Sequence, residues 1–209
     1  MPAIRKKRLL LFTALALAVA SLPCGAYAAP QESWFDDAVF FGDSLSVGLA
    51  DYAQSQRDAG TPCLGAARFL SELGYAVNDV AKPDGDASHP LYKNKRQNPL
   101  KSLEAMKPGK VFILLGVNDS FMEPEAVLSA YDAMLSSLRE TLPEAKLIVQ
   151  GLLPMIAARE DASYSNARFR RINDGLMALA SSHGADYIAL GAVLEKDGAL
   201  DPDLSSDAY

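Results

Sequence analysis

Cysteine and basic residues are scarce in this sequence, and each scarcity excludes a class of protein. Only Cys24 and Cys63 occur among the 209 residues, so neither a disulfide-rich framework nor a cysteine cluster for a metal can form. Beyond residue 28, 16 Lys and Arg stand against 26 Asp and Glu, which leaves a net charge of −10. Because such a surface repels phosphate groups, we exclude nucleic acid as a partner.

One uncharged apolar run, residues 9–20, lies near the start of the chain. The four residues before it, 5–8, are all basic, and residues 26–28 (Ala-Tyr-Ala) form a small-x-small cleavage site. Together these are the three parts of a secretory signal peptide. We therefore predict a signal peptide at residues 1–28 that is cleaved near Ala28, and a secreted or extracytoplasmic protein of the cell envelope.

Two other interpretations of this segment fit less well. A membrane anchor needs about 20 apolar residues, whereas this run is shorter and is followed by Pro23 and Gly25. Lipidation of Cys24 requires a different sequence before the cysteine than Ser-Leu-Pro. We therefore expect no stable membrane span after cleavage, and Cys63 as the one remaining cysteine.

The rest of the chain, residues 29–209, alternates between apolar runs and helical patterns. The apolar runs predict buried strands at residues 38–41, 66–70, 111–115, 146–153 and 187–190. Helical patterns cover residues 47–57, 99–106, 124–138 and 169–179, and a polar stretch at 82–97 predicts a surface loop. Strands that are apolar on both faces and separated by helices form a parallel sheet covered on both sides. We therefore predict a single α/β domain with three layers.

Two loops follow predicted strands at the same edge of this sheet. Gly42-Asp43-Ser44 follows the first apolar run, and residues 116–119 (Gly-Val-Asn-Asp) follow the central one. Ligands of open α/β sheets bind beyond the carboxyl ends of the strands. The first loop has neither the P-loop sequence nor GxGxxG. A serine at such a strand end can instead present its hydroxyl as a nucleophile.

The pairing of these loops resembles the SGNH (GDSL) hydrolases, a superfamily of esterases, lipases and acylhydrolases. Residues 41–44 (Phe-Gly-Asp-Ser) are similar to the first block of the family, and residues 116–119 are similar to its third block. The resemblance runs from about residue 35 to residue 209. It implies a flavodoxin-like α/β/α sandwich with a five-stranded parallel sheet.

The resemblance also implies acyl transfer to a serine. Ser44 would attack a carboxylic ester and form an acyl-enzyme. The developing oxyanion would contact the backbone N–H groups of Ser44 and Gly74 and the side-chain amide of Asn118. The substrate would be a small-molecule, glycan or lipid ester, and no metal or other cofactor would be needed.

Three further residues near these loops have expected roles. Asp43 and Asp119 would support the loops rather than take part in catalysis. Gly65 is a second candidate for the glycine of the oxyanion hole, because it also lies near the second predicted strand.

The last block of the family, Asp-x-x-His, is incomplete in this sequence. Residues 207–209 (Asp-Ala-Tyr) match its first three positions, so we expect Asp207 to orient a catalytic histidine that follows in a longer chain. His183 precedes Gly184 at the end of a predicted helix, which indicates a capping role at the opposite edge of the sheet. His89 lies in the polar stretch on the side of the site, and we expect it to face solvent.

Two other functions fit parts of the pattern. An inactive SGNH-type domain would bind an acylated glycan or lipid without cleaving it, and the residue after Tyr209 discriminates it from an enzyme. A flavodoxin-like nucleotide-binding protein shares the α/β order but does not explain why Ser44 and Asn118 occur together. We predict an exported serine esterase or acylhydrolase.

Overall fold

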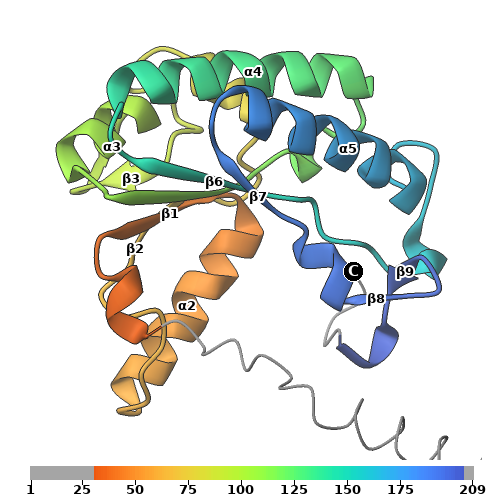
Figure 1. Cartoon of the computed structure of the whole chain (residues 1–209), viewed down its shortest axis with the longest axis horizontal. Helices are drawn as coiled ribbons and strands as arrows, with labels where there is room; N and C mark the ends of the chain where they lie inside the picture. The colour runs from red at the N-terminus through yellow and green to blue at the C-terminus, as the bar shows by residue number, and fades with distance from the viewer. Residues whose placement is uncertain (1–30, 205–209) are drawn as a thin grey trace, which may run out of the picture. The chain divides into compact units, whose positions relative to one another are not determined.

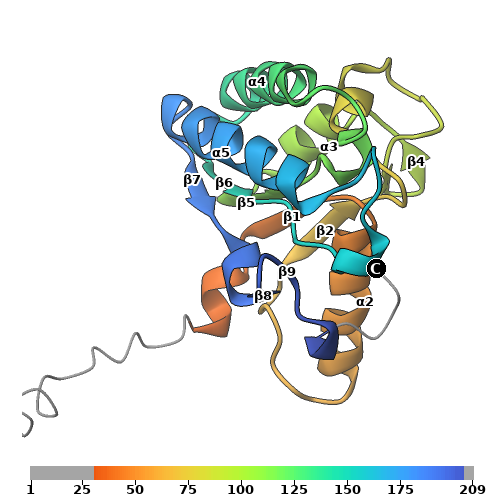
Figure 2. The same ribbon diagram turned by 90° about the vertical axis from the view of Figure 1, so that its right-hand side faces the viewer.

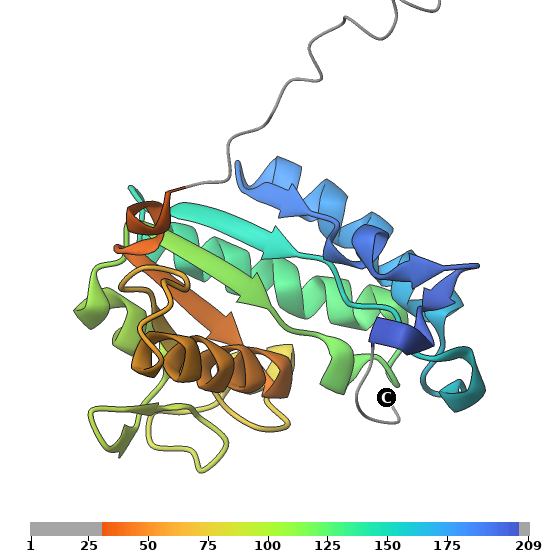
Figure 3. The ribbon, with the colours of Figure 1, turned by 90° about the horizontal axis from the view of Figure 1, so that it is seen from below.

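The computed structural model describes residues 31–204, which contain a central parallel sheet. The predicted signal peptide and Asp207 lie outside the described residues. The sheet has five strands in the order β2-β1-β5-β6-β7, and each neighbouring pair is parallel. The strands are β1 (Ala38–Gly42), β2 (Arg68–Ser71), β5 (Lys110–Leu114), β6 (Lys146–Gln150) and β7 (Asp186–Ile188). Their arrows run in one direction in Figure 3, so the carboxyl ends of the strands lie at one edge.

Helices cover both faces of the sheet. They are α2 (Ser44–Asp58), α3 (Pro99–Met106), α4 (Pro124–Thr141) and α5 (Asn166–Ser182). Helices α3, α4 and α5 lie on one face and α2 lies on the other (Figures 1 and 2). The chain moves from β1 to β2 in one direction along the sheet and from β5 to β7 in the other, so right-handed crossovers place the helices on opposite faces. The predicted three-layer α/β fold is confirmed.

Alternate residues of the strands belong to two separate hydrophobic cores, as the period of a strand requires. The larger core joins β1, β5 and β6 to α4 and α5, through residues that include Val39, Phe41, Val111, Ile113, Val149, Leu135 and Leu176. The smaller core lies on the face of α2 and is rich in aromatic rings. In it, Phe40 stacks on Phe112 with ring centroids 4.5 Å apart and on Phe69 with centroids 5.3 Å apart.

Helix α3 begins and ends where its sequence predicts. The Asn98 side chain caps it by accepting the Leu100 backbone N–H at 3.0 Å, and Pro99 is the first helical residue. Lys107 ends it with a left-handed backbone (φ 49°). In the helix predicted at 124–138, the apolar residues of one face of α4 are all buried: Val127, Tyr131, Met134, Leu135 and Leu138.

The structure differs from the predicted elements in several places, among them the last strand, which ends at Ile188 and not at residue 190. The strand expected to reach residue 153 ends at Gln150, after which the chain leaves the sheet. The stretch 82–97 contains a short hairpin, β3 (Leu91–Tyr92) with β4 (Lys95–Arg96). A second hairpin, β8 (Glu195–Lys196) with β9 (Ala199–Leu200), follows β7.

Short 3-10 helices lie in the connections: η1 (Glu32–Phe35), η2 (Val77–Ala81), η3 (Val117–Asp119), η4 (Ala157–Arg159), η5 (Leu190–Val193) and η6 (Pro202–Leu204). Within residues 31–204, none of the helices has both the length and the apolar composition that crossing a bilayer requires.

Candidate active site

Ser44 is the first residue of α2, directly after β1. Asp43 caps the helix, because its Oδ1 accepts the Leu45 backbone N–H at 3.0 Å. Ser44 is exposed, whereas Asp43 is only 1% exposed. The first N–H groups of a helix have no partner within it, so the start of α2 offers hydrogen-bond donors beside the Ser44 hydroxyl.

Gly42 permits this geometry because the end of β1 lies close to β5. A Cβ at residue 42 would lie 2.6 Å from the Leu114 carbonyl oxygen and would also collide with the Ser46 side chain. A larger residue would therefore displace the helix that carries Ser44.

Asn118 lies in η3, immediately after β5, and it is half-buried. Its side-chain Nδ2 donates to the Tyr75 carbonyl oxygen at 2.9 Å. Gly116 precedes it with φ +110°, a backbone conformation that favours glycine. Because an amide nitrogen carries two hydrogens, one N–H of Asn118 is left for a further acceptor.

Asp119 is 2% exposed, and its carboxylate binds the segment after β2. Oδ2 accepts the Val77 N–H at 2.7 Å, and Oδ1 accepts the Asn78 N–H at 3.3 Å and the Asn78 Nδ2 at 2.7 Å. These bonds join the loop after β2 to the loop after β5, at the edge of the sheet that carries Ser44.

The two candidate glycines lie at opposite edges of the sheet. Gly74 follows β2 with φ +70°, is exposed, and belongs to a turn in which the Tyr75 N–H donates to the Glu72 carbonyl at 3.3 Å. Gly65 precedes β2, and its N–H is already bound to Glu32 Oε2 at 2.7 Å. Only Gly74 is therefore at the edge that carries Ser44 and Asn118.

Asp43 holds a buried carboxyl group with one unpartnered oxygen. Within the described part of the chain, Asp43 Oδ2 has no hydrogen-bond partner. Burial raises the pKa of Asp43 to about 6, against the lowering effect of the Leu45 N–H, and the nearby Asp119 charge raises it further. The carboxyl group therefore changes charge in a mildly acidic range.

Neither histidine is bonded to Ser44. His89 was expected to face solvent, but it is 0% exposed: its Nδ1 pairs with the Tyr75 hydroxyl at 3.2 Å and its Nε2 with the Pro83 carbonyl at 3.0 Å. The expectation failed because the stretch 82–97 folds back over the ring instead of extending into solvent. His183 ends α5 before β7, at the opposite edge, and its Nε2 is 2.7 Å from Asp132 Oδ1.

A cavity of about 670 Å³ opens beside these loops. Leu45, the neighbour of Ser44, and Asn118 both line it. Arg159, Asp161 and Tyr164 add polar groups to the lining. The rest of the lining is apolar and consists of Val117, Leu153, Pro154, Met155, Phe169, Leu194 and Leu200. No group of three or more His, Cys, Asp or Glu side chains in residues 31–204 is arranged to hold a metal ion.

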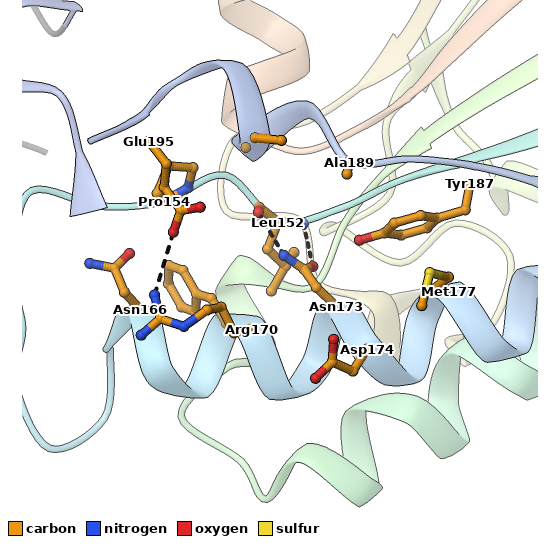
Figure 4. Close-up of a pocket in the computed structure, with 13 residues that line it drawn as sticks. Leu152, Pro154, Asn166, Arg170, Asn173, Asp174, Met177, Tyr187, Ala189 and Glu195 are labelled. Atoms are coloured by element: carbon orange, nitrogen blue, oxygen red, sulfur yellow. Dashed lines mark hydrogen bonds and ion pairs between the residues drawn. The ribbon is translucent and has the colours of Figure 1, made fainter. Parts of the chain in front are cut away.

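The segment after β6 forms one wall of this cavity, and two asparagines of α5 bind the backbone of that segment. Asn173 Oδ1 accepts the Leu152 N–H at 2.7 Å, and its Nδ2 donates to the Leu152 carbonyl at 3.0 Å. Asn166, two helical turns earlier, makes the same pair of bonds to Met155, at 2.8 and 2.9 Å. Figure 4 shows the Asn173 bonds beside a second cavity of about 300 Å³, between α5 and the segment after β7. Residues 153–155 are thereby held against the larger cavity.

Tyr75, Asn166 and Asn173 also contribute to the site, although their roles were not expected from the sequence. A signal for the asparagines was present, because they recur seven residues apart on the same face of the helix as Phe169, Ile172 and Leu176. Polar residues within an apolar stripe need partners when buried, and here the partners are backbone groups. Tyr75 gave no such signal, since its site contact is made by its carbonyl group.

Comparisons with known proteins agree with this architecture. The model of the GDSL-like lipase/acylhydrolase family matches residues 40–209. A search of curated proteins found no match.

Similar solved structures include a candidate platelet activating factor from Streptococcus pneumonia, with 18% identity, a TM-score of 0.58, and coverage of 100% of this chain and 91% of that one. A candidate acylhydrolase from Bacteroides fragilis has 13% identity and a TM-score of 0.58, covering 82% and 76%. The acetyl xylan esterase AlAXEase has 13% identity and a TM-score of 0.55, covering 75% and 78%. At these identities the likeness concerns the fold.

Proposed function

The chain belongs to the GDSL-like lipase/acylhydrolase family, and we propose that it hydrolyses carboxylic esters through an acyl-enzyme on Ser44. The observation that carries this proposal is the meeting of three features at one place. Ser44 is exposed at the start of α2, Asn118 has an amide N–H to spare, and both adjoin the same cavity through Leu45 and Asn118 itself.

In the proposed reaction, Ser44 Oγ bonds to the ester carbonyl carbon as its proton leaves. The carbonyl oxygen becomes an oxyanion beside the Asn118 amide and the N–H groups of Ser44 and Gly74. Such donors stabilise charge that develops only in the transition state. The C–O bond then breaks, the alcohol leaves with a proton, and water hydrolyses the acyl-enzyme to a carboxylic acid and free Ser44.

The proton acceptor for Ser44 is not one of the two histidines. His89 uses both ring nitrogens inside the protein, and His183 is bound to Asp132 at the other edge of the sheet. Serine is a weak nucleophile unless a base takes its proton. We therefore propose that residues 31–204 supply the nucleophile and the oxyanion donors but not the imidazole of the reaction.

The cavity favours an ester with an aliphatic chain. Its volume of about 670 Å³ lies within the range that encloses drug-sized ligands, and its lining is mostly apolar. Each methylene group that enters an apolar environment gains about 0.8 kcal/mol. We propose that the aliphatic group of the ester, on its acyl or its alcohol side, lies against Leu153, Met155 and Leu200.

Hydrolysis of p-nitrophenyl esters tests the nucleophile. Ser44→Ala should abolish hydrolysis and leave the unfolding temperature unchanged. Added imidazole should accelerate p-nitrophenol release by the unaltered protein more than by Ser44→Ala, which gives the background of imidazole alone. Equal rates for the two proteins would refute the assignment. Binding of the ester without any release of p-nitrophenol would favour an inactive binding domain.

The chain-length preference has a matched pair of variants. From acetate to butyrate, kcat/KM should rise by up to about 15-fold, as two buried methylene groups allow. Leu200→Gln, inside the cavity, should reduce this ratio, whereas Leu204→Gln should not, because Leu204 is exposed and outside it. Alkyl acetates of increasing length separate the acyl side from the alcohol side. If the ratio of kcat/KM for butyrate to kcat/KM for acetate is the same in the unaltered protein and in both variants, the cavity does not bind the aliphatic group.

We also propose export, on the strength of the basic, apolar and cleavage segments at residues 5–28. The protein recovered from outside the cytoplasm should begin at Ala29 by N-terminal sequencing. An intact Met1 on that material would contradict cleavage.

A further inference from the structure

Tyr75 and His89 form a buried pair beneath the loop that follows β2. Tyr75 is 1% exposed and His89 is 0% exposed. The Tyr75 hydroxyl lies 3.2 Å from His89 Nδ1, while His89 Nε2 lies 3.0 Å from the Pro83 carbonyl and 3.3 Å from the Lys82 carbonyl.

One protonation state accounts for all of these contacts. The carbonyl groups can only accept, so we assign the ring proton of His89 to Nε2, which leaves Nδ1 as an acceptor. The Tyr75 hydroxyl then donates to Nδ1. Burial raises the pKa of Tyr75 well above its usual range, which keeps this donor protonated. The hydrogen bond with His89 thus fixes the ring of Tyr75.

The backbone of Tyr75 carries this restraint to the active site. Its carbonyl oxygen accepts the Asn118 Nδ2 at 2.9 Å. An amide group is planar, so fixing one N–H of Asn118 also fixes the direction of the other. That second N–H is the one proposed to face the oxyanion.

The surrounding contacts hold the pair from two more sides. Arg96 binds the His89 carbonyl and the Glu72 carboxylate. Glu72 in turn donates its N–H to the Gly42 carbonyl at 3.3 Å, at the end of the strand that leads to Ser44. The stretch 82–97 therefore reaches Asn118 through the His89 imidazole and Tyr75, and it reaches Gly42 through Arg96 and Glu72.

We propose that Tyr75 and His89 are positioning residues for Asn118, aligning its amide with the oxyanion by fixing the Tyr75 carbonyl. This inference rests on the proposed function, since only a hydrogen-bond donor to the reacting group needs such alignment. Neither residue touches the substrate. Small misplacements of catalytic groups can lower rates by up to about 100-fold, so a loosened Asn118 should lower kcat more than it changes KM.

A double-mutant cycle tests the proposal. Tyr75→Phe keeps the buried ring and removes only the hydroxyl, and it should lower kcat about tenfold with KM within twofold. In an Asn118→Ala background the same substitution should change kcat less than twofold, because there is no amide left to align. His89→Gln should repeat this pattern. His183→Gln, which breaks the bond to Asp132 at the opposite edge, is the control and should leave kcat unchanged in both backgrounds.

The outcomes separate this inference from the proposed function. If Asn118→Ala has a normal kcat, Asn118 is not an oxyanion donor and the proposed function fails at that residue. If Asn118→Ala is strongly impaired but Tyr75→Phe lowers kcat equally in both backgrounds, the pair only supports the fold and the positioning role is overturned. Should His89→Gln fail to fold, the Asn118 side-chain amide signal in the NMR spectrum of Tyr75→Phe decides: a shifted or broadened signal supports alignment, and an unchanged one refutes it.

Discussion

The two edges of the central sheet hold their loops with opposite kinds of side chain. At the amino edge, arginines donate to carbonyl groups: Arg57 to Cys63, Leu64 and Ala67, Arg68 to Met106, and Arg139 to Ala145, His183 and Gly184. At the carboxyl edge, carboxylates and amides accept backbone N–H groups, as Asp43, Asp119, Asn166 and Asn173 do. Three residues depart from the pattern. Arg168 binds the Ser120 and Met122 carbonyls at the carboxyl edge, and at the amino edge Glu32 and Asp36 accept the Gly65 and Ala66 N–H groups.

The direction of the helices explains part of this difference, because Met106, His183 and Gly184 lie at helix ends and the Leu45 N–H lies at a helix start. Each helix runs opposite to the strands, so unpaired carbonyl groups of helix ends collect at the amino edge and unpaired N–H groups collect at the carboxyl edge. Cations satisfy the first and anions the second. A developing oxyanion therefore finds the N–H groups of helix starts at the carboxyl edge, where Ser44 and Asn118 lie.

The largest expected difference between the two edges is in kcat, when one hydrogen-bond donor is removed at each edge. Asn118→Ala should lower kcat by about 100- to 1000-fold with a smaller change in KM, the usual result of losing an oxyanion donor. Arg139→Ala should leave kcat unchanged and lower the free energy of unfolding by about 2 kcal/mol, because charge-assisted hydrogen bonds are lost. Ester kinetics and urea unfolding of both variants measure this. A loss of kcat in Arg139→Ala would show that the edges do not have separate roles.

The architecture could be read from the sequence because it depends on apolar patterns. The five apolar runs all gave strands of the sheet, and the helices predicted at 99–106 and 124–138 begin at Pro99 and Pro124, as expected. The sequence could not predict that the strand ends at Gln150, because residues 151–153 are still largely apolar. Contacts with Asn173, distant in sequence, hold Leu152 away from the sheet.

A smaller, pH-dependent effect is expected at the cap of α2. The pKa of Asp43 is raised to about 6 in the folded protein by burial, above its value of about 3.9 in an unfolded chain. The stability that Asp43 contributes is therefore present below pH 4 and is lost as the pH rises through 6. The loss amounts to about 3 kcal/mol at pH 8, at 1.36 kcal/mol for each pH unit.

Asp43→Asn should remove this dependence, because asparagine keeps the capping oxygen but carries no charge. The variant and the unaltered protein should have similar unfolding free energies at pH 4, and the variant should be the more stable one at pH 8. Urea titrations at the two pH values check this. A stability difference that stays constant with pH would mean that Asp43 ionises in the folded protein as freely as in water.

The site itself could be predicted from the sequence only in part. Ser44, Asn118 and the two aspartates follow strand ends, where a local pattern marks them, and the structure places them at one edge. His89 could not be located, because its burial depends on how the stretch 82–97 folds back and pairs Leu91 with Arg96. The same stretch supplies the contacts of Tyr75, so its part in the site becomes visible only in three dimensions.

The smallest expected effect compares two glycines, one at each edge. Gly74 has φ +70°, and no atom of the described residues lies within 4 Å of the point that a Cβ would occupy there; Gly184 has φ +61°, with only Arg139 Nη2 at 4.0 Å from that point. Alanine at either position should therefore cost about 1 kcal/mol, since the strain is in the backbone and not in packing. Both Gly74→Ala and Gly184→Ala should lower the unfolding free energy by this amount. Only Gly74→Ala should also lower kcat, because relaxing φ turns a backbone N–H away from the oxyanion, whereas Gly184 lies at the edge without chemistry. Equal kcat in both variants, at equal loss of stability, would remove the Gly74 N–H from the oxyanion hole and leave Ser44 and Asn118 as its donors.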